Sequence, residues 1–263
     1  MRQIKLDTAS IGDFFIWNDQ RLKIQRSNLK VMLSRKLVVS IAVLASLALA
    51  WQPAPTLETA TQVVDAAYSR IPAIVTSLTV DLAVKDRQFV AGANAVKAFS
   101  GDASCISNWT SNPQGFEQFG SRPVALSAAG QADVISLEAQ RTRNAFKNLS
   151  AQEALALAQK SLPTGHLRIY LEMQGLARAD LRAAYTVGIA GQNNSFIFPY
   201  RSAFLDDWAA MPSNAGRFAG TMVYYFDLNK AGLDSKGTLN VVVKTEANSD
   251  CAYSVAVDLS KFE

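Results

Sequence analysis

The chain has 263 residues, with 26 Lys and Arg, 22 Asp and Glu, one His and two Cys, and a formal net charge of +4. A hydrophobic content of 49% with only 18% charged residues excludes a disordered or low-complexity polar protein. The single His and two distant Cys are too few for zinc-finger, blue-copper or iron–sulfur sites.

The first 50 residues have the pattern of an export leader. A basic pair, Arg35 and Lys36, precedes an uncharged apolar run that closes with Ala-Leu-Ala at Ala50. This order predicts a secretory signal peptide over 32–50, cleaved between Ala50 and Trp51. The run is shorter than the roughly 20 apolar residues of a membrane-spanning helix.

Two alternatives apply to this leader. The first is an uncleaved signal anchor, which would make the chain a single-pass membrane protein held by residues 37–51. The second concerns the start of the chain: translation would begin at Met32, and residues 1–31 would come from a start assigned too far upstream. Contact with the membrane is expected only through the leader, and only if the leader is not cleaved.

The positive charge belongs to the leader. Residues 1–50 hold eight Lys and Arg against three Asp and Glu, a net charge of +5, whereas residues 51–263 hold 18 against 19, a net charge of −1. The overall charge therefore gives no support to a nucleic-acid partner. We expect residues 51–263 to form a single exported globular domain.

The sequence of the first half of this domain predicts both helices and strands. Apolar residues at helical spacing predict a helix over 56–70, and alternation predicts a strand over 78–84. Residues 100–123 are rich in Gly, Ser, Asn and Pro and predict a long loop. A further strand is predicted over 133–139, and a helix that opens with a capping box is predicted over 151–161.

The second half of the domain predicts β structure throughout. Alternating patterns separated by turn residues predict strands over 166–174, 181–190, 195–200, 218–228, 238–246 and 251–260. Short connections between consecutive strands require antiparallel pairing. The predicted fold class is therefore mainly β or α+β. It has an antiparallel β-sandwich-like sheet in the C-terminal half, with one or two short helices before it.

The two cysteines are the candidates for a disulfide bond. An exported protein can form a bridge, and two cysteines allow one. Cys251 lies on the expected inward face of the last strand, and Cys105 lies in the long expected loop. A Cys105–Cys251 bridge would hold that loop over the sheet; the alternative is two unpaired buried thiols.

Motifs for catalysis or metal binding are weak. His166 is the only histidine, no G-x-S-x-G elbow accompanies it, and it is interpreted as a surface residue at a strand start. The segment 227–234 has Asp, Asn and Gly at calcium-loop positions, but Thr238 stands where the bidentate Glu belongs, so it predicts a turn. No metal site and no cofactor are expected.

One cluster remains as a candidate ligand site: Tyr200, Asp206, Asp207 and Trp208. Two acids beside aromatic residues suit a carbohydrate or a cation. Successive residues of a strand point to opposite faces, however, so Asp206 and Asp207 are not expected to act as a catalytic pair. The alternative is a Trp that anchors a loop on the sheet edge, with solvated acids beside it.

These patterns favour an exported, non-catalytic β-rich protein that binds or scaffolds at the cell envelope, in the periplasm or outside the cell. Its expected partner is a cell-envelope glycan or protein. The alternative is a secreted hydrolase, acting on glycans, whose carboxylates are assembled by the fold. The hydrolase requires two carboxyls about 5–10 Å apart in a cleft lined by Trp or Tyr.

Overall fold

The computed structural model describes residues 50–191, 196–212, 214, 216–230 and 237–263. The predicted leader lies outside these residues, except for Ala50, and so does most of the predicted turn after Ala190. Within the described residues, no helix is long and apolar enough to cross a membrane.

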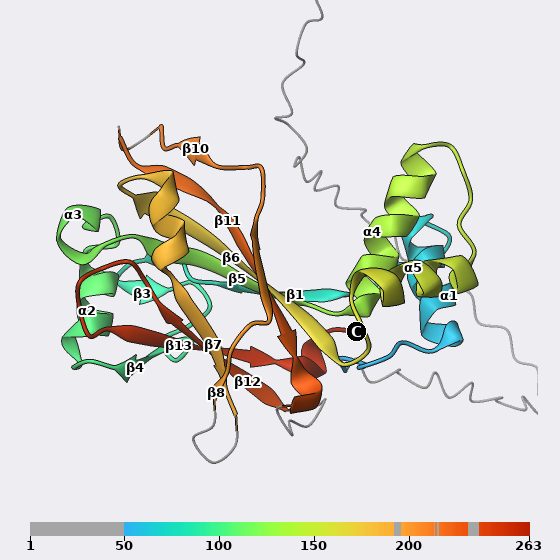
Figure 1. Cartoon of the computed structure of the whole chain (residues 1–263), viewed down its shortest axis with the longest axis horizontal. Coiled ribbons are helices and arrows are strands. Elements are labelled where there is room, and N and C mark those ends of the chain that lie inside the picture. Colours follow the sequence, from blue (N-terminus) through green and yellow to red (C-terminus); the bar gives the residue numbers. More distant parts are fainter. Residues whose placement is uncertain (1–49, 192–195, 213, 215, 231–236) are drawn as a thin grey trace, which may run out of the picture. The chain divides into compact units, whose positions relative to one another are not determined.

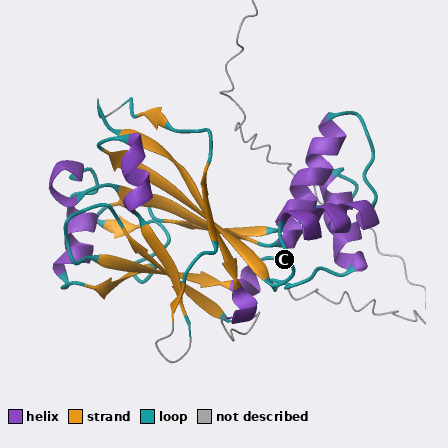
Figure 2. Ribbon diagram, in the orientation of Figure 1, coloured by secondary structure: helices purple, strands orange, loops and turns teal. Residues whose placement is uncertain are grey.

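The predicted fold class is confirmed: two antiparallel sheets pack face to face, with helices at their ends (Figure 1, Figure 2). The six-stranded sheet contains β1 (Ser77–Asp81), β5 (Arg122–Ala129), β6 (His166–Leu176), β9 (Arg201–Phe204), β10 (Ala209–Ala210) and β11 (Phe218–Asp227). The five-stranded sheet contains β4 (Val96–Ser100), β7 (Thr186–Ala190), β8 (Phe196–Ile197), β12 (Thr238–Lys244) and β13 (Ala252–Asp258). A small hairpin joins β2 (Val84–Lys85) to β3 (Gln88–Phe89).

Strand order shows how the sequence is divided between the two layers. The six-stranded sheet runs β1-β5-β6-β11-β10, and β9 also pairs with β11; the five-stranded sheet runs β4-β13-β12-β7-β8. Every pairing is antiparallel. The strands of the C-terminal half therefore do not form one sheet. They alternate between both layers, and the core lies between them.

The core follows the predicted alternation. In β6 the side chains of Leu167, Ile169 and Leu171 are fully buried between the sheets, whereas Glu172 on the opposite face is exposed. In β13 the same period buries Val255 and its apolar neighbours two positions away. A strand with one face buried must hold its register, because a slip of one residue would turn its apolar side chains to the other face.

Three helices form a separate bundle: α1 (Leu57–Ala67), α4 (Gln131–Asn144) and α5 (Ala151–Ser161). Their apolar faces share one core, against which Tyr225 of β11 also packs. An ion pair of 2.9 Å between Arg168 of β6 and Asp133 of α4 joins the bundle to the outer face of the six-stranded sheet. Both helices that the sequence predicts in this region are confirmed, and Ser150 caps α5 through the predicted capping box.

The strand predicted over 133–139 is wrong, because these residues lie inside α4. Ala132, Ile135 and Ala139 are buried at a spacing of three and four, which is the helical period. Seven residues contain too little of either pattern to separate a period of two from one of 3.6.

The loop predicted over 100–123 is also wrong. It contains α2 (Ser104–Ser111) and α3 (Phe116–Phe119), and it leads into β5. The described chain thus has more helices than the one or two that the sequence predicts. Polar residues such as Ser and Asn favour caps and turns. Tertiary packing of Cys105 and Trp109 stabilises α2 despite them.

Three predicted strands are shorter than expected. The first half of 181–190 is a 3-10 helix (Ala179–Ala184), 195–200 retains only β8, and 78–84 divides between β1 and β2. The other predicted strands are confirmed with ends that shift by a few residues.

Candidate functional site

The four residues that the sequence predicts as a ligand site lie along one edge of the six-stranded sheet: Tyr200, Asp206, Asp207 and Trp208. The backbone N–H of Tyr200 donates to Tyr225, whereas Asp207 contacts Thr221. Tyr225 and Thr221 are four positions apart on β11, or about 13 Å at roughly 3.3 Å per residue. The structure therefore does not bring the four side chains to one point.

Asp207 holds the edge segment on β11. One oxygen of its carboxylate accepts the backbone N–H of Thr221 at 2.9 Å, and the other accepts the Thr221 hydroxyl at 2.5 Å. Asp206 beside it is exposed, and no partner engages its side chain in the described part of the chain. The two acids thus differ: one is a structural acceptor and the other is solvated.

Trp208 covers the edge of the core. Its ring lies over Gly220, so a side chain at this position of β11 would have to displace the indole. The guanidinium of Arg182 lies 5.1 Å from the Trp208 ring and 4.2 Å from the Phe204 ring. This is the arrangement of an anchoring Trp, with a cation between two aromatic faces.

Tyr200 belongs to a different group. Its hydroxyl lies 2.9 Å from Nδ1 of His166, and the other ring nitrogen of His166 lies 3.7 Å from Asp227. Partial burial and the neighbouring Tyr225 phenol raise the pKa of Tyr200. His166 therefore contacts a phenol and an acid at the start of β6, and no serine, threonine or cysteine nucleophile contacts it in the described residues.

The cleft beside Asp207 has a volume of about 360 Å³. Its polar side chains are Glu172, Gln174, Asp207 and Thr221, and its apolar wall comes largely from the segment that carries Met211. Glu172 lies opposite Thr221 in the register of β6 and β11, so both carboxylates of the cleft adjoin the same threonine. Among the described residues, no aromatic side chain lines it.

The arrangement can accept hydrogen bonds. Glu172 is exposed, and no hydrogen bond or ion pair engages its side chain in the described part of the chain. Ionised carboxylates are acceptors only, and the Gln174 amide supplies both a donor and an acceptor. A ligand rich in hydroxyl groups fits this set.

Sequence reasoning did not assign Glu172 and Gln174 to a site, although a signal was present. The alternation of β6 places both side chains on its polar face, which is the face that the sandwich core does not use. The sequence did not predict that residues 207–212 complete the cleft beside these two side chains. Local pattern does not show which strand an edge loop will pack against.

No group of three or more His, Cys, Asp or Glu that could hold a metal ion occurs among the described residues. The segment predicted as a turn over 227–234 begins as a 3-10 helix (Leu228–Lys230), and its remaining residues lie outside the described part.

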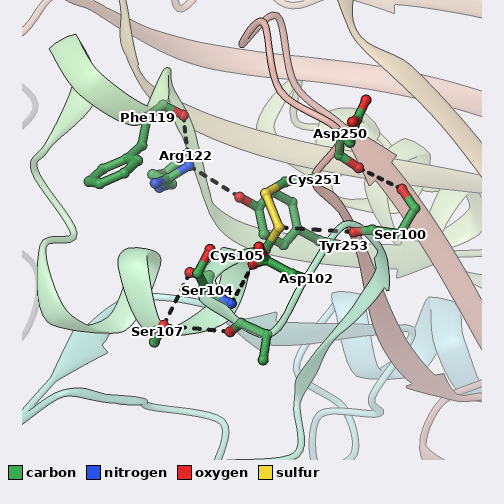
Figure 3. The surroundings of a disulfide bond; sticks show 11 residues. Ser100, Asp102, Ser104, Cys105, Ser107, Phe119, Arg122, Asp250, Cys251 and Tyr253 are labelled. Atoms are coloured by element: carbon green, nitrogen blue, oxygen red, sulfur yellow. Dashed lines mark hydrogen bonds between the residues drawn. A yellow bond between two sulfur atoms is a disulfide. The ribbon is translucent and has the colours of Figure 1, made fainter.

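The predicted disulfide is present. Cys105 of α2 and Cys251, one residue before β13, are bonded with a Cα–Cα distance of 5.7 Å across 146 residues of sequence. Figure 3 shows the bond beside Tyr253, whose hydroxyl accepts a hydrogen bond from Arg122. The bridge holds α2 against the five-stranded sheet.

Comparison with known proteins assigns no relative: no protein family, no curated protein and no solved structure matches this chain.

Proposed function

We propose that this protein is exported and that it binds a cell-envelope glycan, without catalysis, in the cleft formed by β6, β11 and residues 207–212. The observation that carries the proposal is the exposed carboxylate of Glu172, which faces an open cleft beside Gln174 and Asp207. Sugars present many hydroxyl donors, and a carboxylate or amide oxygen accepts them. The volume of the cleft is within the range of ligand sites.

A glycan hydrolase is the second candidate, because Glu172 and Asp207 share the cleft. Glycoside hydrolysis needs one carboxyl as acid and another that is free to act as base or nucleophile. Both oxygens of Asp207 are already hydrogen-bonded by Thr221. This engagement, and the lack of an aromatic wall among the described lining residues, favour binding over hydrolysis.

Two observations support export. The Cys105–Cys251 bond is of the kind that persists in oxidising compartments outside the cytosol. Trp51, the first residue after the predicted cleavage site, is buried, and its backbone N–H donates to Leu259 at 2.8 Å. The first residue after the predicted cleavage site is thus part of the buried core of the folded domain.

Glycan binding is tested with protein purified from cells that express the full chain. Titration with soluble peptidoglycan fragments and envelope polysaccharides should detect binding, and Glu172→Gln should weaken it about tenfold, the value of one hydrogen bond to a charged group. Glu117→Gln, an exposed acid outside the cleft, is the matched control. Absence of binding, or equal binding by Glu172→Gln, contradicts the proposal. Release of new reducing ends during the titration would instead establish the hydrolase.

Export is tested by cell fractionation and N-terminal sequencing. We expect the protein in the envelope or medium, with Trp51 as its first residue. Full-length protein retained in the inner membrane would establish the anchor over 37–51. Replacing Met32 should abolish the product; if only replacement of Met1 does so, translation begins at Met1.

A further inference from the structure

A second cavity, the Arg122 chamber, lies between α2, α3 and the residues before β13. Its volume is about 260 Å³, and it is more enclosed than the cleft over β6. Five of its lining side chains are aliphatic hydroxyls or amides: Ser104, Asn108, Gln118, Asn248 and Ser249. The Cys105–Cys251 bond and the rings of Phe119 and Tyr253 complete its wall (Figure 3).

Arg122 is the charged side chain of this chamber. It is 3% exposed, and it lies at the start of β5. Its Nη1 donates to the carbonyl of Phe119 at 3.0 Å and to the Tyr253 hydroxyl at 3.3 Å. The Trp109 and Phe119 rings each lie 5.6 Å from the guanidinium carbon. Nε and Nη2 have no hydrogen-bond partner in the described part of the chain.

No acid compensates this cation at contact distance. No carboxylate among the described residues lies within 4.0 Å of the Arg122 guanidinium. The neighbouring acid, Glu246, accepts the backbone N–H and the hydroxyl of Ser121 at 2.8 and 2.5 Å. Its carboxylate is therefore directed to another partner and does not line the chamber.

The environment of Arg122 is costly for a bare charge. Burial lowers the pKa of the guanidinium, and the Tyr253 and Tyr185 phenols and Glu246 act in the opposite direction. Even so, an arginine keeps its proton at any physiological pH. A buried cation without an ion-pair partner destabilises a fold, and the cation–π contacts offset only part of that cost.

We propose that the Arg122 chamber binds a small carboxylate-bearing molecule, whose carboxylate accepts hydrogen bonds from Nε and Nη2 of Arg122. The planar fork of a guanidinium matches a carboxylate in a bidentate, charge-assisted pair. This site is independent of the glycan cleft. The chamber contains a cation and prefers an anionic ligand, whereas the cleft contains carboxylates.

The lining narrows the class of ligand. One cation with neutral amides and hydroxyls around it suits a monoanion, because a second negative charge would have no counter-charge in the described lining. The volume of about 260 Å³ lies just below the roughly 300–1,000 Å³ of drug-sized ligand pockets, so the ligand must be small. The five polar side chains can bind amino or hydroxyl substituents, so the ligand class is a hydroxy acid or an amino acid, whose body would pack on Phe119 and Tyr253.

The test uses protein purified from cells that express the full chain, after dialysis to remove bound acids. Calorimetric titration and saturation-transfer NMR are run with lactate, benzoate and the common amino acids, each beside its carboxamide. We expect at least one acid to bind with a dissociation constant near 1 mM or lower, and its amide to bind at least tenfold more weakly.

Variants locate the site. Gln118→Glu and Asn248→Asp each place a negative charge, the same sign as that of the ligand, at an exposed position of the chamber without a change in size. Each should weaken acid binding tenfold or more. Gln152→Glu, an exposed position on α5, is the matched control and should bind as the parent does. Arg122→Lys keeps the charge and removes the fork, so it should also lose affinity. Because that residue is buried, its result counts only if its melting temperature is near that of the parent.

Four outcomes overturn the proposal. Three of them are the absence of binding by every acid, equal binding of an acid and its amide, and unchanged affinity in both Gln118→Glu and Asn248→Asp. Equal binding of inorganic sulfate would also overturn it, since the site would then recognise charge without the carboxylate geometry. None of these results bears on Glu172, so the glycan proposal stands or fails separately.

Discussion

The sandwich and the helical bundle bury their apolar surface in different ways. Among the described residues, six of the eleven buried members of the bundle core are alanines, whereas one of the 28 buried members of the sandwich core is an alanine. Small side chains let helices approach closely, but each buries little apolar area. Large branched and aromatic side chains stabilise through the area that they remove from water. The bundle should therefore tolerate added volume poorly, and the sandwich should tolerate lost volume poorly.

Removal of the disulfide should have the largest effect, and it should act on the sandwich. In the double variant Cys105→Ser/Cys251→Ser, the unfolded chain regains the entropy of a 146-residue loop. The chain-entropy account of this loss predicts about 5 kcal/mol as an upper value. Urea denaturation measures it. The parent protein with its disulfide reduced should unfold at the same urea concentration as the double variant. An unfolding midpoint of the parent that does not change on reduction would contradict the prediction.

Truncation of a sandwich residue should have the next largest effect. Ile169 is fully buried between the sheets, so Ile169→Ala should lower the free energy of unfolding by about 2–5 kcal/mol through lost transfer energy and a residual cavity. Ile135→Ala is the same change in the bundle core. Amide hydrogen exchange measures which of the two cores each variant destabilises. If the cores unfold separately, exchange in α1, α4 and α5 should accelerate in Ile135→Ala while β6 stays protected. Equal acceleration everywhere would show one cooperative unit.

A larger side chain in the core should destabilise the bundle more than the sandwich, which is the reverse of the effect of truncation. Ala158 is fully buried on α5, and Ala158→Leu should cost about 1–3 kcal/mol because the neighbouring helices must separate. Ala156→Leu, at an exposed position of the same helix, changes the composition identically and should cost almost nothing. Equal stabilities of the two variants would show that the bundle is not closely packed.

The helix cap should have the smallest effect, with a defined pH dependence. Ser150→Ala removes the N-cap of α5 and should cost about 1 kcal/mol at neutral pH. Hydrogen bonds from the Ser150 side chain and backbone lower the pKa of Glu153. A lowered pKa means that this interaction stabilises the fold above the ordinary carboxyl pKa of about 4.3 and that the contribution is lost as the pH falls through the lowered value.

Thermal unfolding between pH 7 and pH 3 measures this dependence. The difference between the parent and Ser150→Ala should narrow toward acid. Ser161→Ala at the other end of α5 is the control and should show no such narrowing. A constant difference across the range would contradict the assigned role of Glu153.

Much of the fold was accessible from local pattern. The alternation in β6, β12 and β13 is long enough to separate inward from outward side chains. The Cys105–Cys251 bond was predictable because the chain has only two cysteines. The α4 helix was not predicted, because the spacing of four residues between Ile135 and Ala139 fits both the period of a strand and that of a helix in so short a window. The 104–111 helix was hidden by a polar composition that only its packing overrides.

The candidate sites divide in the same way. The polar face of β6 was predicted, and Glu172 lies on it. The predicted cluster around Asp207 separates because its members contact positions of β11 that are about 13 Å apart. Arg122 gave no signal at all, since an arginine beside a proline in a polar segment reads as an exposed turn residue.

The sequence by itself determined the strand alternation, the two capped helices of the bundle and the concentration of positive charge in the first 50 residues. Each of these depends on neighbours within a few residues, so local spacing and composition predict it. Only the tertiary structure decided that the C-terminal strands divide between two sheets, that Asp207 is held by Thr221, and that Arg122 is buried beside a cavity. These outcomes depend on contacts between segments far apart in sequence, and burial changes the chemistry of a charge that local pattern would place in water.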